Sequence, residues 1–169
     1  CNPCNDYGQC KLEAERELLK LNGENFLISI IRIPMIYGSQ APGNIKAITK
    51  LVHWMPIIPL GNINNKRSFI SIQNLVYCIH NILKQQKDGV FLLADDECIS
   101  TSNLIKALIK INKKKRILLN SRIVEFFIRN FTPTIHNKLW GDLVIDASLS
   151  KKELGLDLPI IEDYGLNEI

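Results

Sequence analysis

The sequence predicts an α/β fold in which helices alternate with short strands that pair in parallel. Apolar runs of strand length alternate with segments of helical periodicity along all 169 residues. The run at residues 26–33 is apolar without alternation, which is typical of a strand covered on both faces of a parallel sheet. Hydrophobic residues make up 46% of the chain and charged residues 22%, a balance that favours a packed core over disorder.

The first half of the chain is divided by Gly and Pro. Leucines at helical spacing predict a first helix, which Asn22 and Gly23 end as a C-cap. Pro34 has no N–H for a ladder and stops the strand that follows. The expected elements are a helix at residues 6–21, a strand at 26–33, a Gly/Pro loop at 38–43, a helix at 44–53, a turn between Pro56 and Pro59 and a polar loop at 61–65.

The second half continues the alternation. Ser100 or Thr101 can cap one helix, Pro133 closes another and Gly155 breaks the last. The expected elements are a strand at 67–72, a helix at 73–86, a strand at 90–93, a helix to about 111, a short strand at 116–119, a helix at 121–131, an extended segment at 143–146 and a helix at 148–154.

The net charge of +4 comes largely from the basic run at residues 113–116. We interpret this run as a solvated loop, because a nucleic-acid site would interleave its basic residues with aromatic ones on one face. The longest apolar run is strand-length and no signal peptide is recognisable, so neither a membrane nor a nucleic-acid partner is expected.

The cysteines indicate a reducing compartment, and we expect a cytoplasmic protein. Their number, five, is odd. Cys1 and Cys4 form a C-x-x-C at the N-terminus, but a zinc site needs a second ligand pair at suitable spacing, and the three histidines stand alone. We therefore expect no metal site.

The pattern Y-x-x-x-K at Tyr7 and Lys11 is the first candidate for catalysis. Residues four apart share a helix face, so the phenol and the ammonium converge. A phenol is a poor base at neutral pH, and a nearby ammonium stabilises its anion, as acid/base catalysis requires. The alternative is an ordinary exposed pair of side chains.

Arg67 and Asn44 are candidates for binding a phosphate-bearing substrate. The guanidinium of Arg67 is a rigid bidentate fork at a strand start, which suits a diphosphate. Asn44 lies at an expected helix N-terminus, where backbone N–H groups favour phosphate. The alternatives are a surface ion pair for Arg67 and a helix cap for Asn44.

Four motifs in order resemble one known family. They are N-P-x-x-D-Y-G-x-x-K-L-x-A-E at residues 2–15, R-I-P-M-I-Y-G at 32–38, the substrate-region elements G-N, P-L-G and R-S-F-I-x-I-x-N-L within 43–75, and L-V-I-D-A-S-x-x-x-x-x-L-G at 143–155. The set resembles the NAD-dependent epimerase/dehydratase family of extended short-chain dehydrogenases/reductases, in its bacterial UDP-sugar 4-epimerase and 4-keto reductase subgroup.

The resemblance implies a fold and roles for individual residues. It implies the C-terminal portion of such an enzyme: an incomplete Rossmann-like sheet with a small α/β substrate-binding region. Residues 1–38 would end the Rossmann-like domain and residues 39–169 would mainly bind substrate, with residues 90–93 returning to the main sheet. Tyr7 and Lys11 would be catalytic and contact NAD or NADP together with backbone near Pro34, and Asn44 and Arg67 would bind the nucleotide sugar.

The same resemblance predicts that the chain needs a separate cofactor-binding segment. The glycine-rich cofactor loop G-x-x-G-x-x-G of the family has no counterpart in these 169 residues. We therefore expect a truncated enzyme that does not turn over alone and that pairs with a separate N-terminal half, or a non-catalytic remnant. An unrelated α/β binding domain is the third alternative. Homodimerisation through the Tyr-bearing helix, the identity of the sugar, epimerase against reductase, and NAD against NADP all stay open.

Overall fold

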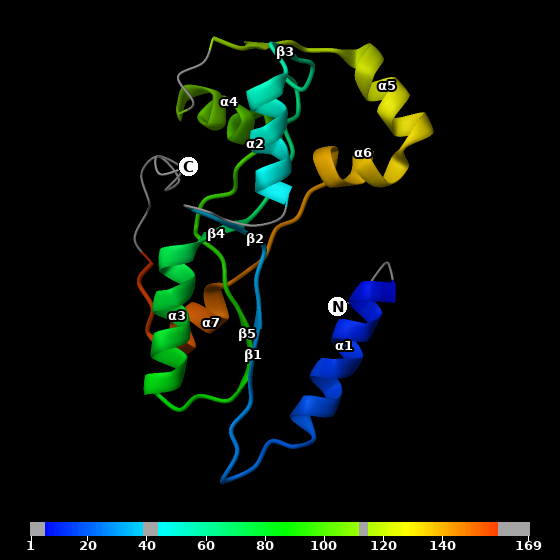
Figure 1. Cartoon of the computed structure of the whole chain (residues 1–169). Coiled ribbons are helices and arrows are strands. Elements are labelled where there is room, and N and C mark those ends of the chain that lie inside the picture. Colours follow the sequence, from blue (N-terminus) through cyan, green and yellow to red (C-terminus); the bar gives the residue numbers. More distant parts are fainter. Residues whose placement is uncertain (1–5, 39–43, 112–114, 159–169) are drawn as a thin grey trace.

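The computed structural model describes residues 6–38, 44–111 and 115–158, and their arrangement is shown in Figure 1. The C-x-x-C at Cys1 and Cys4 and most of the loop at 38–43 lie outside the described residues. The helices are α1 (Asp6–Leu19), α2 (Asn44–Trp54), α3 (Ile72–Lys84), α4 (Thr101–Ile111), α5 (Arg122–Phe131), α6 (Pro133–Trp140) and α7 (Ser148–Leu154). The strands are β1 (Ser29–Arg32), β2 (Met35–Tyr37), β3 (Ile57–Ile58), β4 (Phe69–Ser71), β5 (Gly89–Leu92) and β6 (Ile117–Leu118).

The strands of the described residues form three parallel pairs. β1 pairs with β5, β2 with β4 and β3 with β6. Alternating helices and parallel strands confirm the α/β fold that the sequence predicts. Residues 90–93 were expected to return to the main sheet, and β5 lies directly beside β1, with Ser29 opposite Gly89. The division into regions at residue 38 stays a prediction.

The single strand predicted at residues 26–33 is wrong in its extent. β1 covers four of those residues, and the chain resumes as β2 after Ile33 and Pro34. Because Pro34 cannot donate to a ladder, the pairing changes there from β5 to β4. Pro34 itself is buried.

Two further predictions need correction, and both involve prolines. The turn expected between Pro56 and Pro59 contains the short strand β3, whose Ile58 is fully buried. Pro133 closes α5, as predicted, but it also opens α6, which the sequence reading missed. Proline is favoured at the first position of a helix because the N–H it lacks would have no partner there.

Local capping explains the helix ends that were predicted well. Ser121 caps α5 by accepting from the N–H of Val124, and Ser71 caps α3 by accepting from the N–H of Asn74. α7 spans the predicted residues and ends at Gly155, which adopts a left-handed φ of 60°. Asp146 accepts from the N–H of Ser148 at 3.0 Å and lies at the start of that helix, a structural role like the one its motif indicates.

The core consists of two clusters. One lies around β3 and β4, α2 and α4, with Phe69, Ile58 and Ile105 among its buried side chains. The other lies between α3, β5 and α7, around Ile70 and Phe91. Neither cluster contains a residue of α1, which has no buried residue. Figure 1 shows α1 standing apart from the body of the molecule, beside β1 and β5.

Candidate active site

Tyr7 and Lys11 lie one helical turn apart on α1 and face each other. The Lys11 Nζ lies 5.7 Å from the centre of the Tyr7 ring. The Tyr7 side chain is 73% exposed. The predicted convergence of phenol and ammonium is therefore present, and both groups are open to a ligand or to another polypeptide.

An ion pair fixes α1 to the sheet. The Arg32 Nε donates to Glu15 Oε2 at 3.0 Å, and the Arg32 Nη2 contacts the same oxygen. This hydrogen bond raises the pKa of Arg32, against the opposing effect of burial. Because Arg32 ends β1, the ion pair positions the Tyr-bearing helix relative to the carboxyl end of that strand.

The carboxyl ends of three strands meet at Asp95. Its Oδ2 accepts from the Tyr37 hydroxyl at 2.6 Å and from the Ser71 N–H at 3.1 Å, and its Oδ1 accepts from the Asn74 side chain at 2.8 Å. Tyr37 ends β2, Ser71 ends β4, and Asp95 follows β5. Sequence reasoning missed Asp95, although a polar residue just after a parallel strand is a recognised signal of a site.

Pro34 and Arg67 lie in different surroundings from the α1 pair. Pro34 is buried between β1 and β2. Arg67 Nη1 donates to the carbonyls of Lys138 at 2.9 Å and Gly141 at 3.0 Å. Burial lowers the pKa of Arg67, with Asp142 opposing the shift. Within the described residues, no hydrogen bond or ion pair joins Tyr7 to either of these positions.

The structure therefore brings Tyr7 and Lys11 together but leaves the other candidates dispersed. Asn44 is the first residue of α2, and its side chain lies outside the described part of the chain. The surface ion pair considered for Arg67 is replaced by bonds to backbone carbonyls. The substrate-binding roles of Asn44 and Arg67 stay predictions, as does the cofactor role of Pro34.

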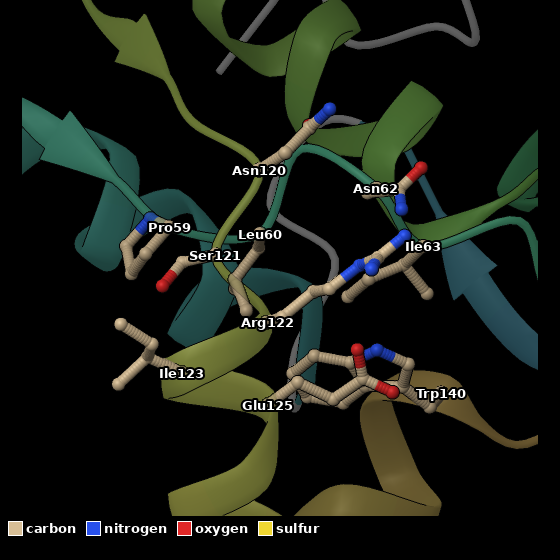
Figure 2. Close-up of a pocket in the computed structure, with 10 residues that line it drawn as sticks. All are labelled: Pro59, Leu60, Asn62, Ile63, Asn120, Ser121, Arg122, Ile123, Glu125 and Trp140. Atoms are coloured by element: carbon tan, nitrogen blue, oxygen red, sulfur yellow. The ribbon is translucent and has the colours of Figure 1, made fainter.

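A pocket of about 500 Å³ opens between the P-L-G segment and the α5–α6 hairpin. Its lining residues come from the segment after β3, the start of α5 and the end of α6. They are Pro59, Leu60, Asn62, Ile63, Asn120, Ser121, Arg122, Ile123, Glu125 and Trp140. Figure 2 shows Arg122 extending from α5 across the pocket toward Asn62 and Ile63.

One wall of the pocket combines aromatic and charged groups. The His136 ring stacks on Trp140, with centroids 5.0 Å apart and planes at 6°. The His136 Nε2 lies 4.0 Å from Glu125 Oε1. Sequence reasoning missed Arg122 and Trp140, since neither belongs to a motif. The available signal for Arg122 was its place in the first turn of the helix predicted at residues 121–131.

No group of three or more His, Cys, Asp or Glu residues in the described part could hold a metal ion. None of the described helices has both the length and the apolar character needed to cross a bilayer.

The parallel α/β fold agrees with the resemblance to extended short-chain dehydrogenases/reductases. Residues 1–94 match the NAD dependent epimerase/dehydratase family. The chain therefore belongs to that family.

Two curated relatives and one solved structure illustrate the similarity. A UDP-glucose 4-epimerase of Vibrio cholerae is 33% identical over 164 residues, covering 93% of this chain and 50% of the relative. A dTDP-4-dehydro-6-deoxyglucose reductase of Escherichia coli is 26% identical over 173 residues, with coverages of 96% and 50%. RMD from Pseudomonas aeruginosa, solved with NADPH, superposes with a TM-score of 0.74 at 15% identity, covering 99% of this chain and 55% of that one. The chain spans about half the length of the curated relatives it matches.

Proposed function

We propose that this chain carries the proton-transferring pair and the substrate-binding region of a nucleotide-sugar 4-epimerase that acts on a UDP-sugar. The observation that carries the proposal is the Tyr7–Lys11 pair, with the ammonium 5.7 Å from the phenol ring on an exposed helix face. The family of the chain and its 33% identity to a UDP-glucose 4-epimerase support the same activity.

Each of the two side chains has a chemical task in this proposal. The Tyr7 hydroxyl exchanges a proton with the sugar hydroxyl at the reacting carbon, and the Lys11 ammonium stabilises the phenolate while it exists. A nicotinamide cofactor, when bound, accepts and returns the hydride. In this proposal Tyr7, Lys11 and backbone near Pro34 would hold the nicotinamide side of that cofactor. The 169 residues contain no glycine-rich loop for its pyrophosphate, so a further polypeptide segment supplies that part.

The pocket beside α5 is the proposed site for the nucleotide part of the substrate. Its Trp140 offers a flat apolar ring for a base, and Arg122 offers a guanidinium for phosphate oxygens. Arg67 helps to position Trp140, because it donates a hydrogen bond to the carbonyl of Gly141, the next residue in the chain. Asn44, at the start of α2, remains a proposed phosphate contact through its helix N-terminus.

A 4-keto-sugar reductase is the second candidate, and the 26% identity to the Escherichia coli reductase favours it to a lesser degree. The reductase delivers a hydride once, whereas the epimerase returns it to the same sugar. Product analysis separates the two, since an epimerase interconverts two UDP-sugars without net consumption of cofactor. A non-catalytic remnant would bind the nucleotide sugar and yield neither product.

Nucleotide binding is tested by titrating the purified chain with UDP in a calorimeter. We expect saturable binding that the substitution Arg122→Gln weakens about tenfold, because a charged hydrogen bond is worth ~1.5–3 kcal/mol. Arg129→Gln is the matched control, since Arg129 lies on the same helix but does not line the pocket. Unchanged binding in Arg122→Gln would overturn the assignment of the pocket.

Catalysis is tested with the chain alone and with a cofactor-binding half supplied in trans. The N-terminal half of the Vibrio cholerae relative is a suitable donor. We expect epimerisation of UDP-glucose only in the mixture, and its loss in Tyr7→Phe. Robust turnover by the chain alone with NAD⁺ would refute the prediction that it needs a separate half. Turnover unaffected by Tyr7→Phe would refute the role of Tyr7.

A further inference from the structure

The outer face of α5 exposes a set of large apolar side chains. Phe126, Phe127 and Phe131 are 63%, 54% and 75% exposed. Ile123, which also lines the pocket, and Ile135 of α6 are exposed as well. We call these five residues the aromatic face. Scattered exposed apolar residues are ordinary, but a contiguous set is typical of a contact surface.

Ring contacts show that the aromatic face is continuous. The rings of Phe126 and Phe127 pack edge to face with centroids 6.0 Å apart. Phe127 and Phe131 stack with centroids 5.9 Å apart. The three rings therefore form one cluster on the surface instead of separate projections.

The aromatic face is not an extension of the core. α5 has no buried residue, and although it packs onto α6, its most shielded apolar side chains, Val124 and Ile128, are only half-buried. Arg122, Glu125 and Arg129 are spaced three and four apart and form a narrow polar stripe. A short helix with a wide apolar face, aromatic rings and arginines beside them has the composition of a membrane-surface helix.

The two helices that carry the aromatic face have an excess of positive charge. α5 and α6 contain three basic side chains, Arg122, Arg129 and Lys138, and one acidic side chain, Glu125. That acidic residue, Glu125, lines the pocket and lies 4.0 Å from His136. A second copy docking through this face would bring two such basic segments together, which like-charge repulsion opposes. An anionic surface complements the segment.

We propose that the aromatic face and its flanking cations dock the protein onto an anionic lipid surface. The phenylalanine rings insert at the headgroup level, and Arg129 and Lys138 contact lipid phosphates and carboxylates. Figure 1 shows α5 at the end of the molecule away from β1 and β5. From the sequence we expected no membrane partner, because no segment is long enough to span a bilayer, and the proposed surface attachment departs from that expectation.

Vesicle flotation tests the proposal with the complete 169-residue chain. The probes are vesicles of phosphatidylcholine alone and of equal parts phosphatidylcholine and phosphatidylserine. We expect flotation with the anionic vesicles, and its loss at high salt. The double substitution Phe126→Ser and Phe127→Ser should abolish flotation. Arg129→Gln should weaken it about fivefold, the equivalent of ~1 kcal/mol for one cation near the surface.

The matched control is the double substitution Val76→Ser and Leu83→Ser on α3. These side chains are 58% and 71% exposed but carry no comparable cluster of aromatic rings and cations, so flotation should be unchanged. Circular dichroism establishes that each variant is folded. Equal flotation with uncharged vesicles, no flotation, or equal loss in the α3 control would each overturn the proposal. Two other results would assign the aromatic face to a different partner. A dimer in sedimentation that the Phe126→Ser and Phe127→Ser variant dissociates would assign it to a second copy of the chain. Binding of single-stranded DNA that the same variant abolishes would assign it to nucleic acid.

Discussion

Glu15 on α1 and Arg32 at the end of β1 form an ion pair that joins the Tyr-bearing helix to the sheet. The Arg32 Nε lies 3.0 Å from Glu15 Oε2 and 3.2 Å from Oε1. Both side chains are largely shielded, at 29% and 21% exposure. Because α1 buries none of its residues, this pair substitutes for the apolar packing that usually holds a helix on a sheet.

The first prediction is that Glu15→Gln loosens α1 without unfolding the core. Removing the carboxylate leaves Arg32 without its charged acceptor and should cost about 1–2 kcal/mol in the local opening of the helix. Hydrogen exchange of the α1 amides measures this as roughly tenfold faster exchange. Glu17→Gln is the control, because Glu17 makes an exposed pair with Lys20 and should change exchange little.

The second prediction concerns Asp95, which accepts three hydrogen bonds from β2, β4 and α3. Asp95→Asn replaces a carboxylate oxygen by an NH₂ group that faces other donors. The free energy of unfolding should fall by about 2–3 kcal/mol in urea titrations. Asp96→Asn is the neighbouring control. Its carboxylate is 68% exposed and contacts only Lys151 among the described partners, so less than about 1 kcal/mol is expected. Equal losses would contradict the central role of Asp95.

The elements that the sequence predicted well are those with local signals. α7 begins and ends as predicted because Ser148 follows an Asp that binds its N–H and Gly155 adopts a left-handed φ. The convergence of Tyr7 and Lys11 was predictable because four-residue spacing sets it within one helix. These features depend on residues only a few positions apart.

The features that were missed depend on tertiary contacts. β3 has two residues, too few to show a period of two, and it exists because Ile58 pairs with Leu118 in β6. The change of partner at Pro34 requires knowing where β4 and β5 lie. The pocket joins the segment that begins at Pro59 to Arg122 and Trp140, which lie about 60 to 80 positions further along the chain. Such distances leave no trace in local spacing.

The third prediction uses Gly38, whose φ is 134°. A Cβ at this position would lie 2.8 Å from the Ile72 Cγ2, at the start of α3. Gly38→Ala therefore combines an unfavourable backbone conformation with a clash, and should lower the free energy of unfolding by about 1–3 kcal/mol. Gly23→Ala is the matched control, since a Cβ there meets nothing within 4 Å. Thermal or urea unfolding of both variants distinguishes them.

The fourth prediction follows from burial of Cys78, which has no exposed surface. Burial raises the pKa of the Cys78 thiol from 9.0 to about 11. The native state then holds its proton where the unfolded state has lost it, so this contribution to stability is full below pH ~9 and is lost as pH rises toward 11. At pH 8 a thiol reagent should label Cys10 and Cys98, which are exposed, and should spare Cys78. Mass spectrometry of the labelled peptides checks this, and rapid labelling of Cys78 in the folded chain would contradict it.

The last prediction separates two roles for Arg67. In the structure the Arg67 Nη1 donates to the carbonyls of Lys138 and Gly141. One nitrogen of the guanidinium that was expected to bind a diphosphate therefore holds the end of α6. Arg67→Lys keeps the charge but loses the planar fork, and should lower the free energy of unfolding by about 1–2 kcal/mol. If Arg67 acts on the substrate only by supporting Trp140, Arg67→Lys should lower the affinity for UDP less than Arg122→Gln does. A larger loss of affinity in Arg67→Lys, with stability unchanged, would assign Arg67 to direct contact with the diphosphate.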